Sequence, residues 1–440
     1  MTHHNRVLVV GAGIAGLTAA HTLAGNGVCV TVYEADRQVG GRMRSEEVEG
    51  APVDCGAQFL SSAYTTIPAL LEAAGLADAL TPTSPWSAVA KDGRLYRTHG
   101  ARPASMLTGG LLGVGNWLLL GAGTARMALR GLRRQPAEAA AWARWDEDDA
   151  AQWVEGAFGA QTTDRIVEPM LHGFFFQELP GMSRALPMAM MAQAHRPRPI
   201  RTLAGGIGRL PQALAAGLDV RTGTPVLAVR PTARGAEVVT ADGAHEADAV
   251  VLATPAPVAA GLYAAGGLER RLLATPYSAT IALLLATDAD FRLPEALRDV
   301  YGVLPARDSR RRIAGLGIER HKAADRASGG ERLNVLLSSR AARDLMDHDD
   351  AAVLAAVLPE VERWLPGVGR HLRWTRLWRW PHALPCTPPG RLRDVRRYRA
   401  TAAGRVVLAG DHMGFPWTDS AAETGRWAAG AVLRAVAGRA

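Results

Sequence analysis

Cysteine is scarce in this chain of 440 residues. The three cysteines, Cys29, Cys55 and Cys386, are too few and too far apart for a disulfide framework, a metal cluster or a Cys-x-x-Cys redox pair. Zinc-ligand spacings, a P-loop and a serine-histidine-aspartate elbow are also missing. We therefore predict a protein of the reducing cytoplasm that holds no metal and relies on a bound cofactor for its chemistry.

Lysine is almost absent. Of the 50 lysine and arginine residues, only Lys91 and Lys322 are lysines, and the net charge is +8. The arginines are scattered, and their denser runs are not interleaved with aromatic residues, as a groove for single-stranded nucleic acid would require. We predict a solvated basic surface and no nucleic-acid partner.

Long uncharged stretches are rare, but residues 106–125 carry no formal charge. Their length is close to the roughly 20 residues that span a bilayer. Several glycines and Asn116 dilute this stretch, so a spanning helix is disfavoured. We expect instead a glycine-rich apolar helix lining a pocket, or a patch in peripheral contact with a membrane surface. The sequence leaves the oligomeric state open.

Glycines with a specific spacing follow the first apolar run. Residues 7–10 read as a strand, residues 11–16 are GAGIAG, and a helical pattern continues through Leu23. In such a strand-turn-helix unit, Gly11 allows the tight turn, Gly13 allows close approach to a pyrophosphate, and Gly16 allows the helix to pack on the sheet. The free N–H groups of the helix start favour phosphate binding.

An acidic residue supports this interpretation. Residues 28–33 read as a second strand, and Glu34 follows Gly16 by eighteen residues, near the spacing expected for a ribose-binding acid. A carboxylate there accepts hydrogen bonds from the 2′-hydroxyl group and repels a 2′-phosphate, which disfavours NADP. FAD and NAD both remain compatible with these residues alone.

The residues that follow resemble a known family. Residues 34–44 read EADRQVGGRMR and residues 53–59 read VDCGAQF. This pattern is similar to that of the flavin-containing amine oxidases and protoporphyrinogen oxidases, whose Gly-Gly-Arg element runs along the pyrophosphate and the flavin. Arg42 can pair with a phosphate in a bidentate manner. The resemblance continues at residues 248–253, 405–411 and 418–425, where the helix start is expected to face the flavin.

The motif and the resemblance together imply bound FAD. Counting along the family pattern places the flavin-linking cysteine near His382, four residues from Cys386, so we expect the FAD to be noncovalent. The predicted cofactor-binding residues are Gly11, Gly13, Ile14, Ala15, Gly16, Glu34, Ala35, Gly41, Arg42, Gly56, Ala57, Gln58, Phe59, Val226, Ala253, Gly410, Asp411, Thr418, Asp419 and Ser420.

The implied fold is α/β, with a discontinuous Rossmann-type FAD-binding domain and an α+β substrate-binding domain built from insertions. We predict that residues 1–80, 200–271 and 395–440 form the FAD-binding domain. Residues 81–199 and 272–394 then form the substrate-binding domain.

The residues at the expected substrate-site positions differ from those of both branches of the family. The lysine of oxygen-reducing amine oxidases falls at Ala282, and the second wall of their aromatic cage falls near Ala383. The propionate-binding arginine of porphyrinogen oxidases falls at Ser87, although Arg94 or Arg97 could replace it. Candidate pocket residues, each equally compatible with simple packing, are Trp417, Gln58, Phe175 and His172.

We therefore predict an FAD-dependent oxidase or dehydrogenase. It would remove hydride from a C–N or C–C bond of a bulky hydrophobic small molecule, with O2 as acceptor and a specialised metabolite as the favoured substrate. One alternative is a protoporphyrinogen or coproporphyrinogen oxidase, or a carotenoid-type desaturase. Another is a redox-silent FAD-binding protein.

Overall fold

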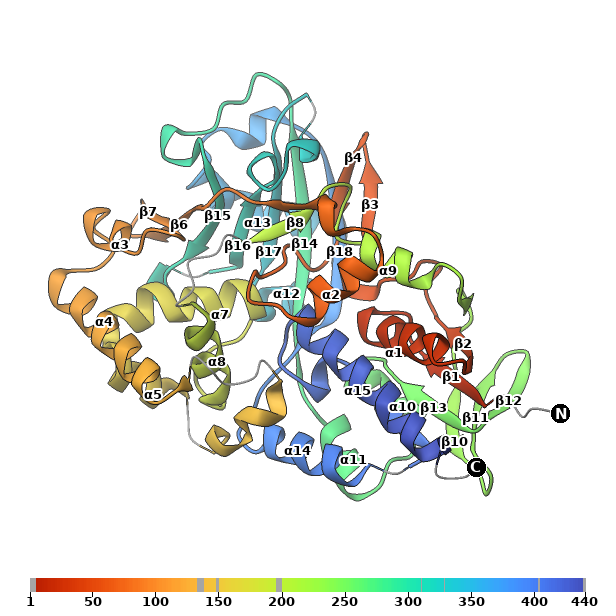
Figure 1. The fold of residues 1–440 in the computed structure, drawn as a ribbon. Helices are drawn as coiled ribbons and strands as arrows, with labels where there is room; N and C mark the ends of the chain where they lie inside the picture. The colour runs from red at the N-terminus through yellow and green to blue at the C-terminus, as the bar shows by residue number, and fades with distance from the viewer. Residues whose placement is uncertain are drawn as a thin grey trace.

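The computed structural model describes residues 5–132, 138–147, 150–194, 200–309, 311–327, 329–402 and 404–437. Its N-terminal strand lies at the centre of a parallel sheet with the strand order β19-β13-β1-β2-β9 (Figure 1). The five strands are β1 (Arg6–Val10), β2 (Cys29–Tyr33), β9 (Asp219–Arg221), β13 (Ala249–Leu252) and β19 (Val406–Leu408). Distant parts of the chain thus build one sheet, and the predicted strand-helix-strand unit is present at its centre.

Two helices pack together beside this sheet. The helix α1 (Ile14–Gly25) connects β1 to β2, and α15 (Thr418–Ala437) lies against it (Figure 1). They approach closely because Gly425 has no side chain: a Cβ atom there would lie 2.1 Å from the carbonyl oxygen of Ala15. Apolar residues of both helices join the sheet residues in one buried core. This packing places the start of α15 near the glycine-rich turn.

A second sheet has the strand order β18-β14-β17-β16-β15-β6-β7 and is antiparallel except between β15 and β6. The strand β14 (Tyr277–Thr287), between the edge strand β18 and β17, is buried throughout. The other strands are β6 (Trp86–Lys91), β7 (Arg94–His99), β15 (Val300–Pro305), β16 (Ile313–Ile318), β17 (Arg332–Leu337) and β18 (Leu372–Pro385).

The two faces of β14 contact different layers. Ile281 and Leu283 share a core with the helices α12 (Ser339–Leu345) and α13 (Asp350–Glu362). Ala282 faces the other way and packs with Val53 and Cys55 at the end of the hairpin β3 (Ser45–Val48) and β4 (Ala51–Asp54). Side chains alternate between the faces of a strand, so β14 joins the second sheet to the hairpin of β3 and β4.

A helical layer lies beside the second sheet and shares a separate core. It contains α4 (Val114–Leu129), α5 (Ala150–Phe158), α7 (Glu168–Phe175) and α8 (Ala185–Ala194). Smaller elements complete the fold: the sheet β10 (Ala228–Pro231), β11 (Ala236–Thr240) and β12 (Gly243–Ala247), the pair β5 (Leu80–Pro82) and β8 (Arg201–Leu203), and the helices α2 (Thr66–Ala73), α9 (Arg209–Ala215), α10 (Ala256–Leu262), α11 (Gly267–Leu273) and α14 (Arg391–Thr401).

The strands of the parallel sheet lie within 1–80, 200–271 and 395–440, and those of the second sheet lie within 81–199 and 272–394. The domain boundaries themselves stay a prediction. Residues 224–227 precede β10 and include Pro225, which has no N–H group for a sheet ladder.

The uncharged segment 106–125 is not one helix. It is divided between α3 (Ser105–Thr108) and α4, and Gly110 lies between them with φ +75°. In the described parts of the chain, no helix is both long and apolar enough to cross a membrane.

Candidate functional site

The glycine-rich turn leaves the start of α1 open. No side chain caps this helix, and its first turn contains no acidic residue. A Cβ atom added to Gly13 would meet nothing within 4 Å, whereas one added to Gly16 would lie 1.9 Å from the carbonyl oxygen of Gly11. Gly16 therefore serves the close packing of the turn, and Gly13 borders free space. An uncapped helix start beside free space suits an anionic group.

Glu34 closes one side of this turn. Its Oε2 atom accepts a hydrogen bond from the backbone N–H of Ala12 at 2.7 Å, and Oε1 accepts one from Asp36 at 2.9 Å. Burial raises the pKa of Glu34 although these hydrogen bonds favour its charged form. Each carboxylate oxygen has a second acceptor position, so Glu34 is able to receive hydroxyl groups of a ribose.

A buried group of polar residues connects Arg42 to the end of β19. Arg42 Nη1 lies 2.5 Å from Asp411 Oδ2 and 2.8 Å from the carbonyl oxygen of Ala383. Tyr277 donates its hydroxyl hydrogen to Asp411 Oδ1 at 2.7 Å. Burial opposes the ionisation of Asp411, but Arg42 and Tyr277 hold its pKa below the ordinary value. The sequence suggested a phosphate partner for Arg42; the structure gives it a carboxylate partner, and a phosphate contact stays a prediction.

The turn that follows β4 is held by Gln58. The Gln58 Nε2 atom donates hydrogen bonds to the carbonyl oxygens of Asp54 at 2.9 Å and Gly56 at 3.0 Å. Its Oε1 atom accepts from Lys322 Nζ at 3.0 Å and Asn334 Nδ2 at 2.8 Å. All four hydrogen-bonding positions of this carboxamide are thus filled by the protein. Gln58 shapes the turn, and its side chain is fully engaged there.

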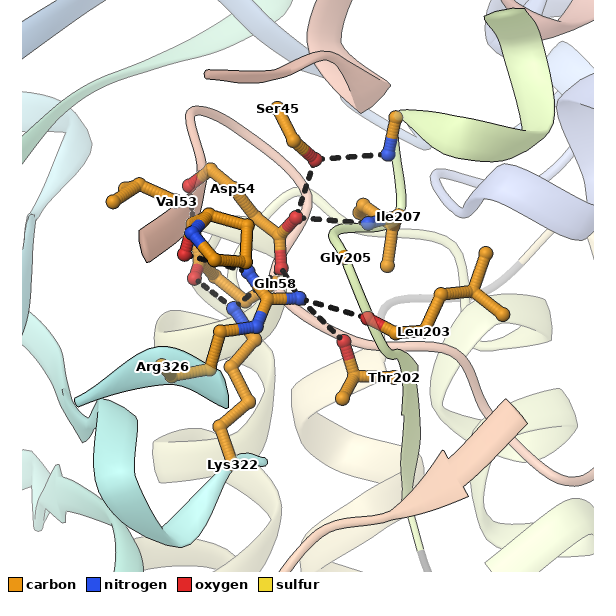
Figure 2. A network of polar contacts seen from close by, with 12 residues as sticks. Ser45, Val53, Asp54, Gln58, Thr202, Leu203, Gly205, Ile207, Lys322 and Arg326 are labelled. Carbon is orange, nitrogen blue, oxygen red and sulfur yellow. Dashed lines mark hydrogen bonds and ion pairs between the residues drawn. The ribbon is translucent and has the colours of Figure 1, made fainter. Parts of the chain in front are cut away.

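Asp54 lies at the centre of a buried ionic network (Figure 2). Its Oδ2 atom lies 2.7 Å from Lys322 Nζ and 3.1 Å from Arg326 Nη2, and all three side chains are 0% exposed. Its Oδ1 atom accepts hydrogen bonds from Ser45 at 2.6 Å and from the N–H of Ile207 at 2.9 Å. Burial alone would raise the pKa of Asp54, but the charges of Lys322 and Arg326 hold it below the ordinary value.

Asp419, at the start of α15, has a different role in the structure from the one that the sequence suggested. The Asp419 carboxylate accepts hydrogen bonds from the backbone N–H groups of Thr66 and Ile67, both at 2.7 Å. It therefore caps α2. Ser420 accepts a hydrogen bond from the N–H of Phe415 at 2.8 Å. Thr418 keeps a partly exposed position at the helix start, so cofactor contacts of these three side chains stay predictions.

Aromatic residues from three segments gather beside the turn after β4. The Phe59 ring lies 5.1 Å from that of Phe174, and the Phe175 ring lies 6.2 Å from that of Trp417. Trp417 also stacks on Phe415 at 4.6 Å. Edge-to-face and offset contacts at these separations are favourable. The structure thus brings together two of the proposed pocket residues, Phe175 and Trp417, in one aromatic wall.

Other candidates lie elsewhere or are engaged. His172 is buried within α7. Arg97, which could have replaced a propionate-binding arginine, places Nη2 2.6 Å from Asp299 Oδ1 and stacks over Trp86 at 4.6 Å. Arg94 is exposed on β7.

Sequence reasoning missed the network behind the turn after β4. Lys322 contacts Asp54 and Gln58 although more than 260 residues separate them in the chain. The position of the expected amine oxidase lysine, Ala282, is buried among apolar residues. One signal was available: Lys322 is one of only two lysines in an arginine-rich chain.

Comparisons with known proteins agree with this arrangement. Residues 14–433 match the family model of flavin containing amine oxidoreductases. The coproporphyrinogen III oxidase of Mycobacterium tuberculosis is 26% identical over 439 residues, covering 92% of each chain. Cyclohexylamine oxidase from Brevibacterium oxydans has a TM-score of 0.76 at 18% identity and covers 99% of this chain and 100% of its own. A fatty acid isomerase from P. acnes that produces CLA has a TM-score of 0.75 at 16% identity and covers 99% of each chain.

The solved structures share the predicted α/β fold, which confirms the fold class. They also differ in the reactions that their names describe, so the fold alone does not identify the substrate. The family match extends over nearly the whole described chain, from the first residue of α1 into α15, and includes the aromatic wall. This chain therefore belongs to the flavin containing amine oxidoreductase family and is a flavin-dependent oxidoreductase.

Proposed function

We propose that this protein binds FAD noncovalently and removes hydride from a C–N or C–C bond of a bulky hydrophobic small molecule, with O2 as acceptor. A specialised metabolite is the favoured substrate. The observation that carries the proposal is the aromatic wall of Phe59, Phe174, Phe175 and Trp417, which adjoins the turn after β4. Such a wall suits a large apolar substrate.

The residues at the glycine-rich turn fit the cofactor. The uncapped start of α1 suits a pyrophosphate, and Glu34 suits the hydroxyl groups of the adenosine ribose. Burial raises the pKa of the Cys386 thiol, which disfavours the thiolate needed for a covalent link. These features support noncovalent FAD.

The flavin, when bound, supplies the hydride acceptor. The protein's own groups have to orient the substrate and exclude water. Phe59, Phe174 and Trp417 are partly exposed, so the wall offers an apolar surface that a substrate could cover. Holding the reacting carbon at about 3–3.5 Å from its acceptor would account for much of the rate enhancement.

The first test is cofactor release followed by anaerobic titration. Denatured protein should release free FAD, and one class among amines, porphyrinogens and polyene precursors should bleach the flavin absorbance of the native protein. Trp417→Ala should lower kcat/KM about fivefold or more for that substrate, since a lost aromatic contact costs about 1 kcal/mol or more. Trp417→Phe should retain most activity. Release of no flavin, even after reconstitution, would contradict the proposal.

Porphyrinogen oxidation is the second candidate, because the Mycobacterium tuberculosis relative is named a coproporphyrinogen III oxidase and covers 92% of this chain. Carotenoid-type desaturation is a further alternative, which the polyene precursors in the same anaerobic titration test. A redox-silent flavoprotein is the rival from another class: after photoreduction it should reoxidise slowly in air and show no spectral change with any substrate.

We also propose peripheral membrane contact through α4. Val114, Leu118 and Leu129 lie along this helix and are 64%, 59% and 88% exposed. Arg126 and Arg130 are exposed at its C-terminal end, where they could meet anionic headgroups. An apolar helix face flanked by arginine suits a position in the membrane interface.

The corresponding test is flotation with vesicles that contain anionic phosphatidylglycerol. Wild-type protein should float, and the double variant Leu118→Glu, Leu129→Glu should remain at the bottom, because two exposed leucines that would enter the membrane interface are each replaced by a charge. Leu227→Glu is a matched control, since Leu227 is 58% exposed elsewhere on the surface. Flotation that is equal in all three proteins would exclude α4 as the contact.

A further inference from the structure

Lys322 has surroundings that no role assigned so far explains. It follows β16 of the second sheet, and its side chain is 0% exposed. Its Nζ atom lies 2.7 Å from Asp54 Oδ2, 3.0 Å from Gln58 Oε1 and 3.5 Å from Glu319 Oε2. The contact with Gln58 is a hydrogen bond, and the contacts with Asp54 and Glu319 are ion pairs, so one ammonium group serves a neutral acceptor and two carboxylates.

The group around Lys322 is balanced in charge. Asp54 and Glu319 are opposed by Lys322 and Arg326, and all four side chains are 0–1% exposed. Arg326 serves other acceptors, donating to the carbonyl oxygens of Pro52 and Leu203, both at 3.0 Å. Among these groups, Lys322 is therefore the cation that reaches Gln58, and its contact is directional as well as electrostatic.

Through Gln58, Lys322 acts on the turn of residues 54–58. Gln58 binds the carbonyl oxygens of Asp54 and Gly56, and the turn is held from the other side by the hydrogen bond from Ala57 N–H to Arg42 O at 2.8 Å. Gly56 packs so closely that a Cβ atom would lie 2.3 Å from Arg42 O. Under the proposed function, this turn lies along the flavin.

We propose that Lys322 is a positioning residue: it holds the Gln58 carboxamide and thereby fixes the turn of residues 54–58 against the flavin. The proposal rests on the proposed function for the identity of the ligand. Composition supports it, because only two positions in this arginine-rich chain carry lysine and the other, Lys91, lies at the protein surface beside Asp92 and Asp308. A planar guanidinium group would not match three converging acceptors around one nitrogen.

The test distinguishes the effect of Lys322 on the position of the turn from its effect on the charge balance of the buried group. Lys322→Met alone would leave a buried carboxylate without its cation, so the main variant is Lys322→Met with Glu319→Gln, which keeps one balanced pair, Asp54 and Arg326. In the apoprotein, hydrogen exchange of the peptide covering residues 54–59 should become faster in this variant. FAD affinity should fall about tenfold, the effect of one lost hydrogen bond to a charged group.

Two further variants keep the test decisive. Gln58→Met leaves Lys322 beside both carboxylates and should give the same faster exchange and weaker FAD binding, even if the double variant fails to fold. Lys91→Met should match wild type in both measurements. Unchanged exchange and FAD affinity in Gln58→Met would overturn the proposal. Failure of the wild-type protein to bind FAD would instead contradict the proposed function. The exchange comparison would still test whether Lys322 and Gln58 hold the turn of residues 54–58.

Discussion

Replacing Gly13 by valine should leave the apoprotein folded and weaken FAD binding by at least about 100-fold, because the new side chain would occupy the space beside the start of α1 where a pyrophosphate is expected. Gly13 has φ −73° and ψ 175°, which any residue adopts. A Cβ atom there would touch nothing within 4 Å. The variant therefore tests the cofactor site without an expected cost in stability.

Two companion variants interpret the result. Gly16→Ala should destabilise the apoprotein, because its Cβ atom would lie 1.9 Å from Gly11 O. Gly25→Val, at the far end of the same helix, again meets nothing within 4 Å and should bind FAD like wild type. Isothermal titration with FAD and thermal unfolding of the apoproteins measure both quantities. Wild-type affinity in Gly13→Val would show that the pyrophosphate does not bind at this turn.

The parts of the fold that could be predicted are those with local signals. The strand before Gly11, the helix after it and the position of Glu34 follow from residues close together in the sequence, and the structure contains β1, α1 and β2 there. The start of α15 at Thr418 was likewise marked by local polar residues. Such signals lie within one strand-turn-helix unit, where chain connectivity limits the possible arrangements.

The parts that could not be predicted depend on contacts between distant segments. Asp419 was predicted to bind the cofactor, yet its carboxylate caps α2, more than 350 residues earlier in the chain. Gln58 was a candidate for substrate binding, but its partners are Asn334 in β17 and Lys322 in the connection between β16 and β17. Nothing in the local sequence specifies which buried donor meets which acceptor, because that depends on how the two sheets pack.

The break in the segment 106–125 illustrates a different limit. Its composition correctly disfavoured a spanning helix, but the turn between α3 and α4 depends on the conformation of single glycines. Gly110 adopts φ +75°, and a Cβ atom on Gly109 would lie 2.7 Å from Ser105 O. Glycine permits such turns without requiring them, so composition alone could not locate the break.

Asp54→Asn should have the largest effect on stability, lowering the free energy of unfolding by about 3–5 kcal/mol, because it leaves buried Lys322 and Arg326 without their shared carboxylate. Asn still accepts hydrogen bonds, so the loss reports the charge more than the shape of the side chain. Asp36→Asn is the control: Asp36 pairs with Arg44 at 3.2 Å but is 60% exposed, and its loss should cost about 1 kcal/mol or less. Chemical denaturation measures both.

The pH dependence of the stability difference between wild type and Asp54→Asn follows from the direction in which the Asp54 pKa is shifted. Lys322 and Arg326 hold that pKa below its ordinary value in the folded protein, so the unfolded chain binds the proton more readily. The contribution of Asp54 is therefore complete above its unfolded pKa, near about 3.9, and is lost as the pH falls through the lower folded value. The stability difference between wild type and Asp54→Asn should stay constant from about pH 5 to 8 and shrink only below about pH 4. A difference that shrinks already near neutral pH would mean that the Asp54 carboxyl group is protonated in the folded protein and that Lys322 is held by Glu319 alone.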